Sequence, residues 1–131
     1  MNTGIIPAFW SGPLLSLLRI MTGLLFLAHG TGKLFGFPEV PMFAGIQVFS
    51  LFGVSGIIDL VGGILIVVGL FTRITAFVLA GFMAVAYFMV HAPMSFYPVL
   101  NNGEAAILFS FIYLYMAAAG GGPWSLDASR A

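Results

Sequence analysis

The chain has 131 residues, of which 61% are apolar and only 6% are charged. Soluble domains carry about 25% charged residues, so this composition excludes a soluble globular protein, and its apolar content excludes a disordered one. The net charge is zero with no basic run, which argues against nucleic acid as a partner. The absence of cysteine excludes disulfides, cysteine-ligated metal centres and thiol relays. The composition therefore indicates an integral membrane protein.

The charged residues divide the chain into apolar runs that predict membrane spans. A spanning helix needs about 20 mostly apolar residues to cross a hydrocarbon core of ~30 Å. We therefore predict an all-α fold, an integral membrane four-helix transmembrane bundle, that forms a single domain over residues 1–131. The predicted spans are residues 14–35, 54–71, 73–91 and 103–119.

The connections between these spans carry their own signals. Residues 36–53 are too apolar for a plain loop, and we expect them to form a short interfacial helix or a re-entrant segment that could cover a site as a lid. Asn102 lies in an Asn-Asn-Gly turn and is placed to cap the last predicted helix.

The basic residues predict an orientation. With four spans both termini share one side, and three of the four basic residues lie on that side, with Lys33 on the other. The excess of Lys and Arg on the inner side predicts that both termini are cytoplasmic. Trp10 and Trp124 then share the inner interface, and Arg19, within the first span, is expected to reach that interface by snorkelling.

Polar residues from all four predicted spans collect in the outer half of the membrane. Ionisable groups at this depth cost several kcal/mol unless they are paired, so we expect them to face inward and to meet. With neutral histidines, the outer half of the membrane holds Lys33 against Glu39, Asp59 and Glu104 and carries a charge of −2. We therefore expect the cluster to exchange protons near physiological pH. The members of the predicted cluster are His29, Lys33, Asp59, His91, Asn102 and Glu104.

Each of these residues also has a purely structural interpretation. A Lys33 pair with Asp59 or Glu104 inside a bundle can act only as a clamp. Glu104 suits the positive end of a helix, and His91 can simply lie at the interface. The small residues have packing roles: the second span places glycines on the face of Asp59, and the third carries Ala76, Ala80 and Ala84 in one stripe.

The order of the motifs resembles the DoxX family of small four-helix bacterial inner-membrane proteins. The resemblance covers nearly the whole chain, although the family more often carries Glu where this chain has Asp59. The matching segments are LFLAHGTGKLFG at 25–36, DLVGG at 59–63, GLFTR at 69–73, His91, NGE at 102–104 and GPWSLD at 122–127.

The resemblance implies a bacterial inner-membrane location and a redox context. Some family members are linked to membrane-associated redox and oxidative-stress complexes, and the related DoxD proteins are subunits of a thiosulfate:quinone oxidoreductase. The favoured hypothesis is a non-catalytic membrane subunit or anchor of such a complex, with a periplasmic polar pocket for a quinone or another small ligand. Its partners would be the lipid bilayer and a soluble or membrane redox protein, with a homo-oligomer left open.

Other functions fit the same residues. A small proton-coupled transporter would use Asp59 as its intramembrane carboxyl, and a scaffold would use the polar cluster only for stability. A haem b between His29 and His91 is the least favoured reading, because it rests on two histidines alone. The chain carries no self-contained catalytic motif and no metal motif, so we expect any chemistry to need a partner or a bound cofactor.

Overall fold

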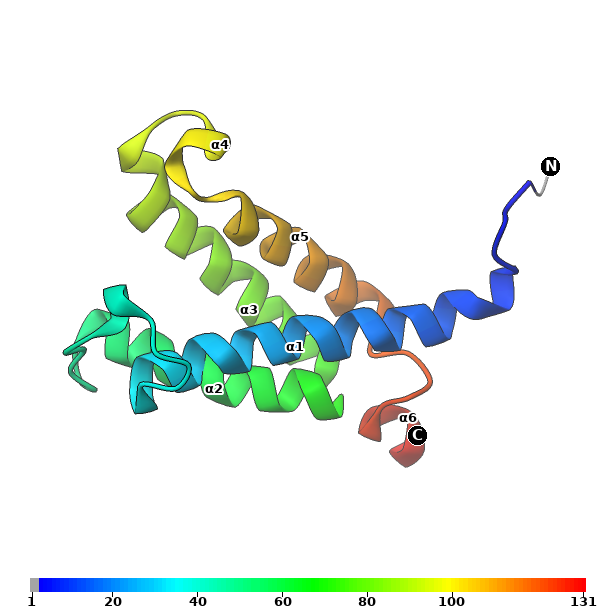
Figure 1. Cartoon of the computed structure of the whole chain (residues 1–131). Coiled ribbons are helices and arrows are strands. Elements are labelled where there is room, and N and C mark those ends of the chain that lie inside the picture. The colour runs from blue at the N-terminus through cyan, green and yellow to red at the C-terminus, as the bar shows by residue number, and fades with distance from the viewer. Residues whose placement is uncertain (1–2) are drawn as a thin grey trace. The chain divides into compact units, whose positions relative to one another are not determined.

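The computed structural model of the protein describes residues 3–131, and Figure 1 shows its helices. No strand occurs among these described residues, so the predicted all-α class is confirmed. Short helical turns lie at Ala8–Trp10, Pro41–Phe43, Tyr87–His91 (a π-turn) and Ala92–Met94. The α-helices are α1 (Ser11–Phe35), α2 (Leu51–Val68), α3 (Thr72–Ala86), α4 (Pro98–Asn101), α5 (Glu104–Ala119) and α6 (Leu126–Arg130).

Within residues 3–131, three helical stretches are long and apolar enough to cross a membrane: Ala8–Phe35, Leu51–Val68 and Thr72–Met94. This confirms a membrane protein that lies in a lipid bilayer. The fourth predicted span corresponds to α5, which is apolar but has only 16 residues. At 1.5 Å per residue it rises about 24 Å, less than the ~30 Å hydrocarbon core, so the fourth crossing stays a prediction.

The helix starts differ from the predicted spans for local reasons. The first helix begins at Ser11, because Pro13 falls in its first turn, where backbone N–H groups have no intrahelical acceptor and proline is tolerated. The second begins at Leu51, because the Ser50 side chain accepts a hydrogen bond from Gly53 N at 3.1 Å and caps the helix. Each helix therefore begins three residues before its predicted span, the first with Pro13 in its opening turn and the second with Ser50 as its cap.

The chain divides into two compact units, and each is described by itself. Unit 1 comprises Met1–Leu70 and Gly121–Ala131, and unit 2 is Phe71–Gly120. Within unit 1, α1 and α2 pack side by side, and within unit 2, α3 packs along α5 (Figure 1).

Glycines bring α1 and α2 into close contact. A Cβ added to Gly30 would lie 2.7 Å from Leu60 N, and one added to Gly63 would lie 2.9 Å from Leu27 N. Real Cβ atoms do not approach so closely, so only glycine allows this backbone separation. Small residues are the usual means of helix association in lipid, where no hydrophobic force drives helices together. The predicted packing role of these glycines is confirmed.

Alanine serves the same purpose in unit 2. Ala76 and Ala80 of the predicted stripe are buried on α3, and Ser110 of α5 donates a hydrogen bond to Ala80 O at 2.9 Å. Ala84, the third member, is only half-buried. The stripe therefore contacts α5 mainly through its first two residues.

The segment between α1 and α2 has little regular structure. A short interfacial α-helix is one expectation for residues 36–53, and the structure instead contains a single 3-10 turn, Pro41–Phe43. Phe37 and Phe49 are exposed, whereas Phe43 is partly buried. The phenylalanines therefore do not form one helical face.

Candidate functional site

A buried ion pair joins the two long helices of unit 1. Lys33 Nζ of α1 lies 2.8 Å from Asp59 Oδ2 of α2, and it also donates to Ser55 Oγ at 3.0 Å. The two charged side chains are 12% and 3% exposed, respectively. Gly56 leaves room for the lysine stem, because a Cβ there would lie 2.9 Å from Lys33 Cβ. The pair therefore links the helices inside their spanning segments.

The spacing of residues on α2 explains the geometry of this pair. Ser55 and Asp59 are four residues apart, so they lie on one face of the helix, one turn above the other. The Ser55 hydroxyl donates to Phe52 O at 2.7 Å, which leaves its oxygen to accept from Lys33. The ammonium is thus held by one charged and one neutral oxygen, as a buried cation requires.

Phe43 of the connecting segment lies beside His29 and Lys33 of α1. Its ring centroid lies 5.5 Å from Lys33 Nζ, within the range of a cation–π interaction, and 6.1 Å from the His29 ring. His29 precedes Lys33 by one turn and is exposed. The segment therefore places an aromatic ring beside the charged pair, as a lid would.

A second polar group lies in unit 2, at the end of the third span. His91 Nδ1 lies 2.9 Å from the backbone oxygen of Asn101, and its ring stacks on that of Tyr87. Asn101 itself is fully buried. Its side chain bonds to Tyr87 Oη at 3.1 Å, to Ser95 O at 3.0 Å and to Gly103 N at 2.8 Å.

The predicted helix cap at Asn102 is wrong by one residue. Asn102 is exposed and has φ 59°, a left-handed conformation that asparagine adopts more readily than most residues. The residue before α5 is Gly103, which makes no side-chain cap, and the amide that binds its N–H belongs to Asn101. The Asn-Asn-Gly sequence predicts a turn, but it does not say which asparagine turns inward.

The structure brings together part of the predicted cluster. Lys33 and Asp59 form the ion pair, and His29 joins them through Phe43 in unit 1. The other members, His91, Asn102 and Glu104, belong to unit 2, where Asn102 and Glu104 are exposed. The convergence of all six residues stays a prediction.

Arg19 is the polar residue that the sequence places wrongly. It is 1% exposed, so it does not snorkel to an interface. Its Nε donates to Ile66 O at 2.8 Å, and its Nη2 donates to Trp124 O at 2.7 Å and Val67 O at 3.3 Å. Nη1 donates to Gly121 O. The guanidinium thus binds the last turn of α2 and the segment that follows residue 120.

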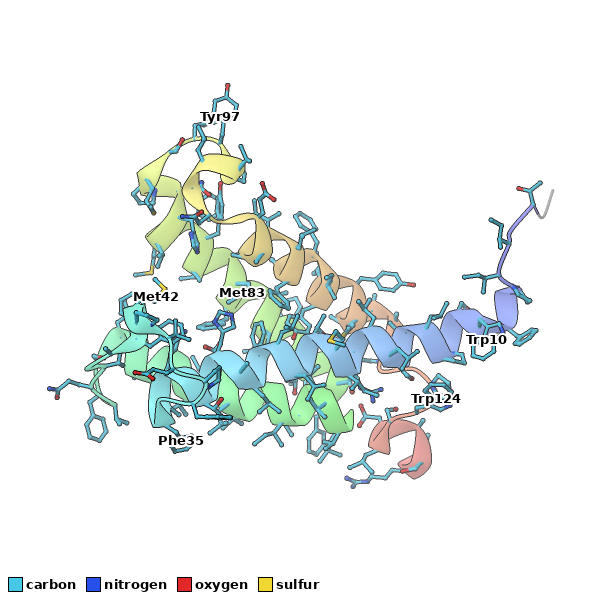
Figure 2. All side chains as sticks on the ribbon, viewed as in Figure 1. Trp10, Phe35, Met42, Met83, Tyr97 and Trp124 are labelled. Carbon is cyan, nitrogen blue, oxygen red and sulfur yellow. The ribbon has the colours of Figure 1, made fainter. Side chains whose placement is uncertain are left out.

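Ser16 strengthens the attachment of this C-terminal segment. Its hydroxyl donates to Gly121 O at 3.0 Å and accepts from Trp124 N at 3.0 Å. Trp10 and Trp124 consequently lie toward the same end of unit 1, away from Phe35 (Figure 2). The sequence gives only a weak signal for this arrangement. Arg19 follows Ser16 by about one turn, and a Gly-Gly-Gly-Pro-Trp segment lies far along the chain, at residues 120–124.

The donor set limits what the site can hold. Within the described residues, no group of three or more His, Cys, Asp or Glu side chains is placed to hold a metal ion. Lys33 and Ser55 can donate to a carbonyl oxygen, and Asp59 can accept from a hydroxyl. This chemistry suits a small organic headgroup with both kinds of oxygen.

Comparison with known proteins gives a family. The DoxX family model matches residues 14–92. A Haemophilus influenzae protein of uncharacterised function is 41% identical over 118 residues, which cover 86% of this chain and 87% of that protein. A Bacillus subtilis protein named "Putative oxidoreductase CatD" is 30% identical over 114 residues, which cover 85% of this chain and 82% of that protein. No solved structure matches the chain.

Proposed function

The chain belongs to the DoxX family, and from that premise we propose that it is a membrane subunit or anchor of a redox complex. In this proposal, Lys33, Ser55 and Asp59 bind the headgroup of a quinone or a similar small ligand. The Bacillus subtilis relative named as an oxidoreductase supports the redox context. The chain has no cysteine and does not carry electrons by itself, so a partner protein or the bound ligand supplies the redox chemistry.

The observation that carries the proposal is the placement of the Lys33–Asp59 pair. Ionisable residues inside membrane spans are rare and expensive, and they commonly mark ligand or proton sites. Here both partners come from helices long enough to span the bilayer, and a histidine and an aromatic ring lie beside them. A clamp alone needs only the pair, whereas a ligand site needs additional groups of this kind.

We propose that this site lies on the periplasmic side of the membrane. We propose that the protein lies in the bacterial inner membrane as one domain over residues 1–131, with both termini cytoplasmic. Trp10 and Trp124, which share one end of unit 1, then mark the cytoplasmic interface, and Lys33 lies at the opposite end of α1. His91, Asn102 and Glu104, the other residues of the predicted polar cluster, belong to unit 2.

Direct binding tests the proposal. The purified protein in lipid nanodiscs is titrated with a short-chain quinone by calorimetry, and we expect saturable binding. Lys33→Met removes the main donor and should weaken binding about tenfold, the effect of losing one charge-assisted hydrogen bond. Val61→Ala is the matched control, since Val61 is exposed on α2, the helix that carries Ser55 and Asp59. It should leave the affinity unchanged.

The structural alternative predicts a different pattern. If the pair is only a clamp, no quinone binds saturably, and Lys33→Met changes stability without any effect on a ligand. A folded Lys33→Met protein that binds quinone as tightly as the Val61→Ala control would contradict the proposed site. A protein that binds no quinone and co-purifies with no redox partner would contradict the proposed function as a whole.

A further inference from the structure

The end of the third span is organised by one buried amide. The Asn101 side chain is fully buried, and it forms three hydrogen bonds, to Tyr87, Ser95 and Gly103. These partners lie before and after it along the chain, in the π-turn, in the loop and at the start of α5. An amide offers two donors and one acceptor oxygen with two lone pairs, so most of its bonding capacity is used. The backbone of Asn101 is therefore fixed in place.

This fixed backbone determines the protonation of His91. The His91 Nδ1 lies 2.9 Å from Asn101 O. A carbonyl oxygen can only accept, so Nδ1 carries the proton in this contact. In the neutral imidazole the other nitrogen, Nε2, then has a free lone pair and acts as an acceptor. Within unit 2, no hydrogen bond from a described residue occupies this nitrogen.

The ring itself is also held in orientation. The His91 and Tyr87 rings stack with centroids 6.3 Å apart and planes 26° from parallel. Tyr87 packs so closely on Gly103 that an added Cβ there would lie 2.6 Å from the tyrosine ring. Both aromatic residues belong to the π-turn Tyr87–His91, and such turns occur frequently at functional sites. The geometry of His91 is thus set from several sides.

We propose that His91 Nε2 is a preoriented hydrogen-bond acceptor for a ligand hydroxyl, and that Asn101 is its positioning residue. Histidines that bind metals or ligands are commonly held in this way, with the second ring nitrogen donating to a backbone carbonyl. The identity of the ligand rests on the proposed function: the hydroxyl is that of a hydroquinone. A hydroquinone has hydroxyl donors that the quinone lacks, so His91 Nε2 can accept a hydrogen bond from the reduced form and not from the quinone.

Nitrogen NMR tests the protonation state without any ligand. The chain contains two histidines, so ¹⁵N-histidine labelling of the full protein in nanodiscs gives two ring systems, and His29→Gln assigns them. We expect His91 to show a protonated Nδ1 and an unprotonated Nε2. A protonated Nε2, or a signal averaged between both forms, would overturn the proposal.

Two variants test the positioning role of Asn101. Asn101→Ala removes all three side-chain bonds and should let the His91 signal average between the two forms. Tyr87→Phe removes one of these bonds and keeps the ring, so we expect a smaller change in the His91 spectrum. It replaces Asn101→Ala as the test if that variant does not fold. A folded variant of either kind with an unchanged His91 spectrum would overturn the role assigned to Asn101.

Titration with two related probes tests the ligand. A short-chain hydroquinone should shift the His91 Nε2 resonance saturably, whereas its dimethyl ether, which has no hydroxyl, should not. His91→Gln should weaken hydroquinone binding about tenfold, as expected for one lost hydrogen bond. Hydroquinone binding that leaves the His91 Nε2 resonance unchanged would overturn this inference alone. Absence of binding by both forms would overturn it together with the proposed function.

Discussion

The single helix α1 carries two buried cations whose partners differ in kind. Arg19 binds four backbone carbonyl oxygens, and Lys33 binds the side chains of Ser55 and Asp59. A backbone carbonyl does not take up a proton or change rotamer, whereas a carboxylate and a hydroxyl can do so. The Arg19 contact is therefore a fixed attachment. In the proposed function, the Lys33 contact is the one whose partners are exchanged for a ligand.

The chemistry of each cation matches its role. The guanidinium carries five donors in a fixed planar fork, which suits several carbonyls at once, and two of its acceptors belong to the last turn of α2. Carbonyls at a helix end have no intrahelical donor and carry a partial negative charge. Arg19 supplies both the hydrogen-bond donors and the positive charge that these carbonyls favour. Lysine is a compact charge on a flexible stem, which can leave one partner for another.

Removal of Arg19 should give the largest effect on stability. Arg19→Met keeps an apolar side chain of similar length but leaves four carbonyls without their donor. We expect the free energy of unfolding to fall by about 3 kcal/mol, because buried polar groups that lose a charged partner are expensive to leave unpaired. The measurement is denaturation of the purified protein by SDS, followed by circular dichroism.

Arg130→Met is the control for this loss, since Arg130 is exposed near the C-terminus. It removes the same charge and should change stability by less than about 0.5 kcal/mol. Equal stability of Arg19→Met and the wild type would show that the carbonyls find other donors. The distinction between a fixed attachment and an exchangeable pair would then be lost.

The Lys33–Asp59 pair should respond to a double substitution in a way that Arg19 cannot. Lys33→Met or Asp59→Leu alone leaves an unpaired buried charge, and each should cost about 2 kcal/mol. The double variant removes both charges and should cost clearly less than the two single losses together. Thermal unfolding of the four proteins in one detergent measures the coupling. Purely additive losses would indicate that the two groups do not depend on each other.

The sequence predicts the Lys33–Asp59 ion pair better than it predicts the contacts of Arg19 with backbone carbonyls. Lys33 and Asp59 are rare charges in apolar spans, and pairing is the physical remedy for both. The sequence therefore predicts a Lys33 pair, with Asp59 or Glu104 as the partner, and the structure selects Asp59. The partners of Arg19 are backbone atoms, which every residue carries, and they lie far away along the chain. No pattern of side chains marks such partners.

The helices themselves are predicted well, because an apolar run of about 20 residues has few alternatives in a membrane. Their starts differ where a single residue decides, as Ser50 does by capping α2. A single residue also decides the start of α5, where Asn101, and not the predicted Asn102, binds the N–H of Gly103. Two identical neighbours differ only in backbone conformation, which the amino-acid sequence alone does not distinguish.

These two asparagines extend the comparison into unit 2. Asn101 resembles Arg19, since two of its three side-chain bonds are to backbone atoms, whereas Asn102 is exposed. Asn101→Ala should lower the free energy of unfolding by about 1.5 kcal/mol through its unpaired partners. Asn102→Gly should be neutral or slightly stabilising, because glycine adopts the left-handed φ of 59° without strain. Chemical denaturation measures the free energy of unfolding of both variants. A lower value for Asn102→Gly than for Asn101→Ala would contradict the prediction.

The smallest expected effect on stability concerns the contact between α1 and α2 at Gly63. Gly63 packs on Leu27, which lies between Arg19 and Lys33 along α1, so a wider helix separation there disturbs both sites at once. Gly63→Ala should cost about 1 kcal/mol by overpacking and should also weaken the proposed quinone binding. Gly81→Ala is the matched control, because an added Cβ there meets nothing within 4 Å. If the two alanine variants were equally stable, close contact at Gly63 would not set the helix spacing, and the two cation sites would each hold α1 to its partners independently.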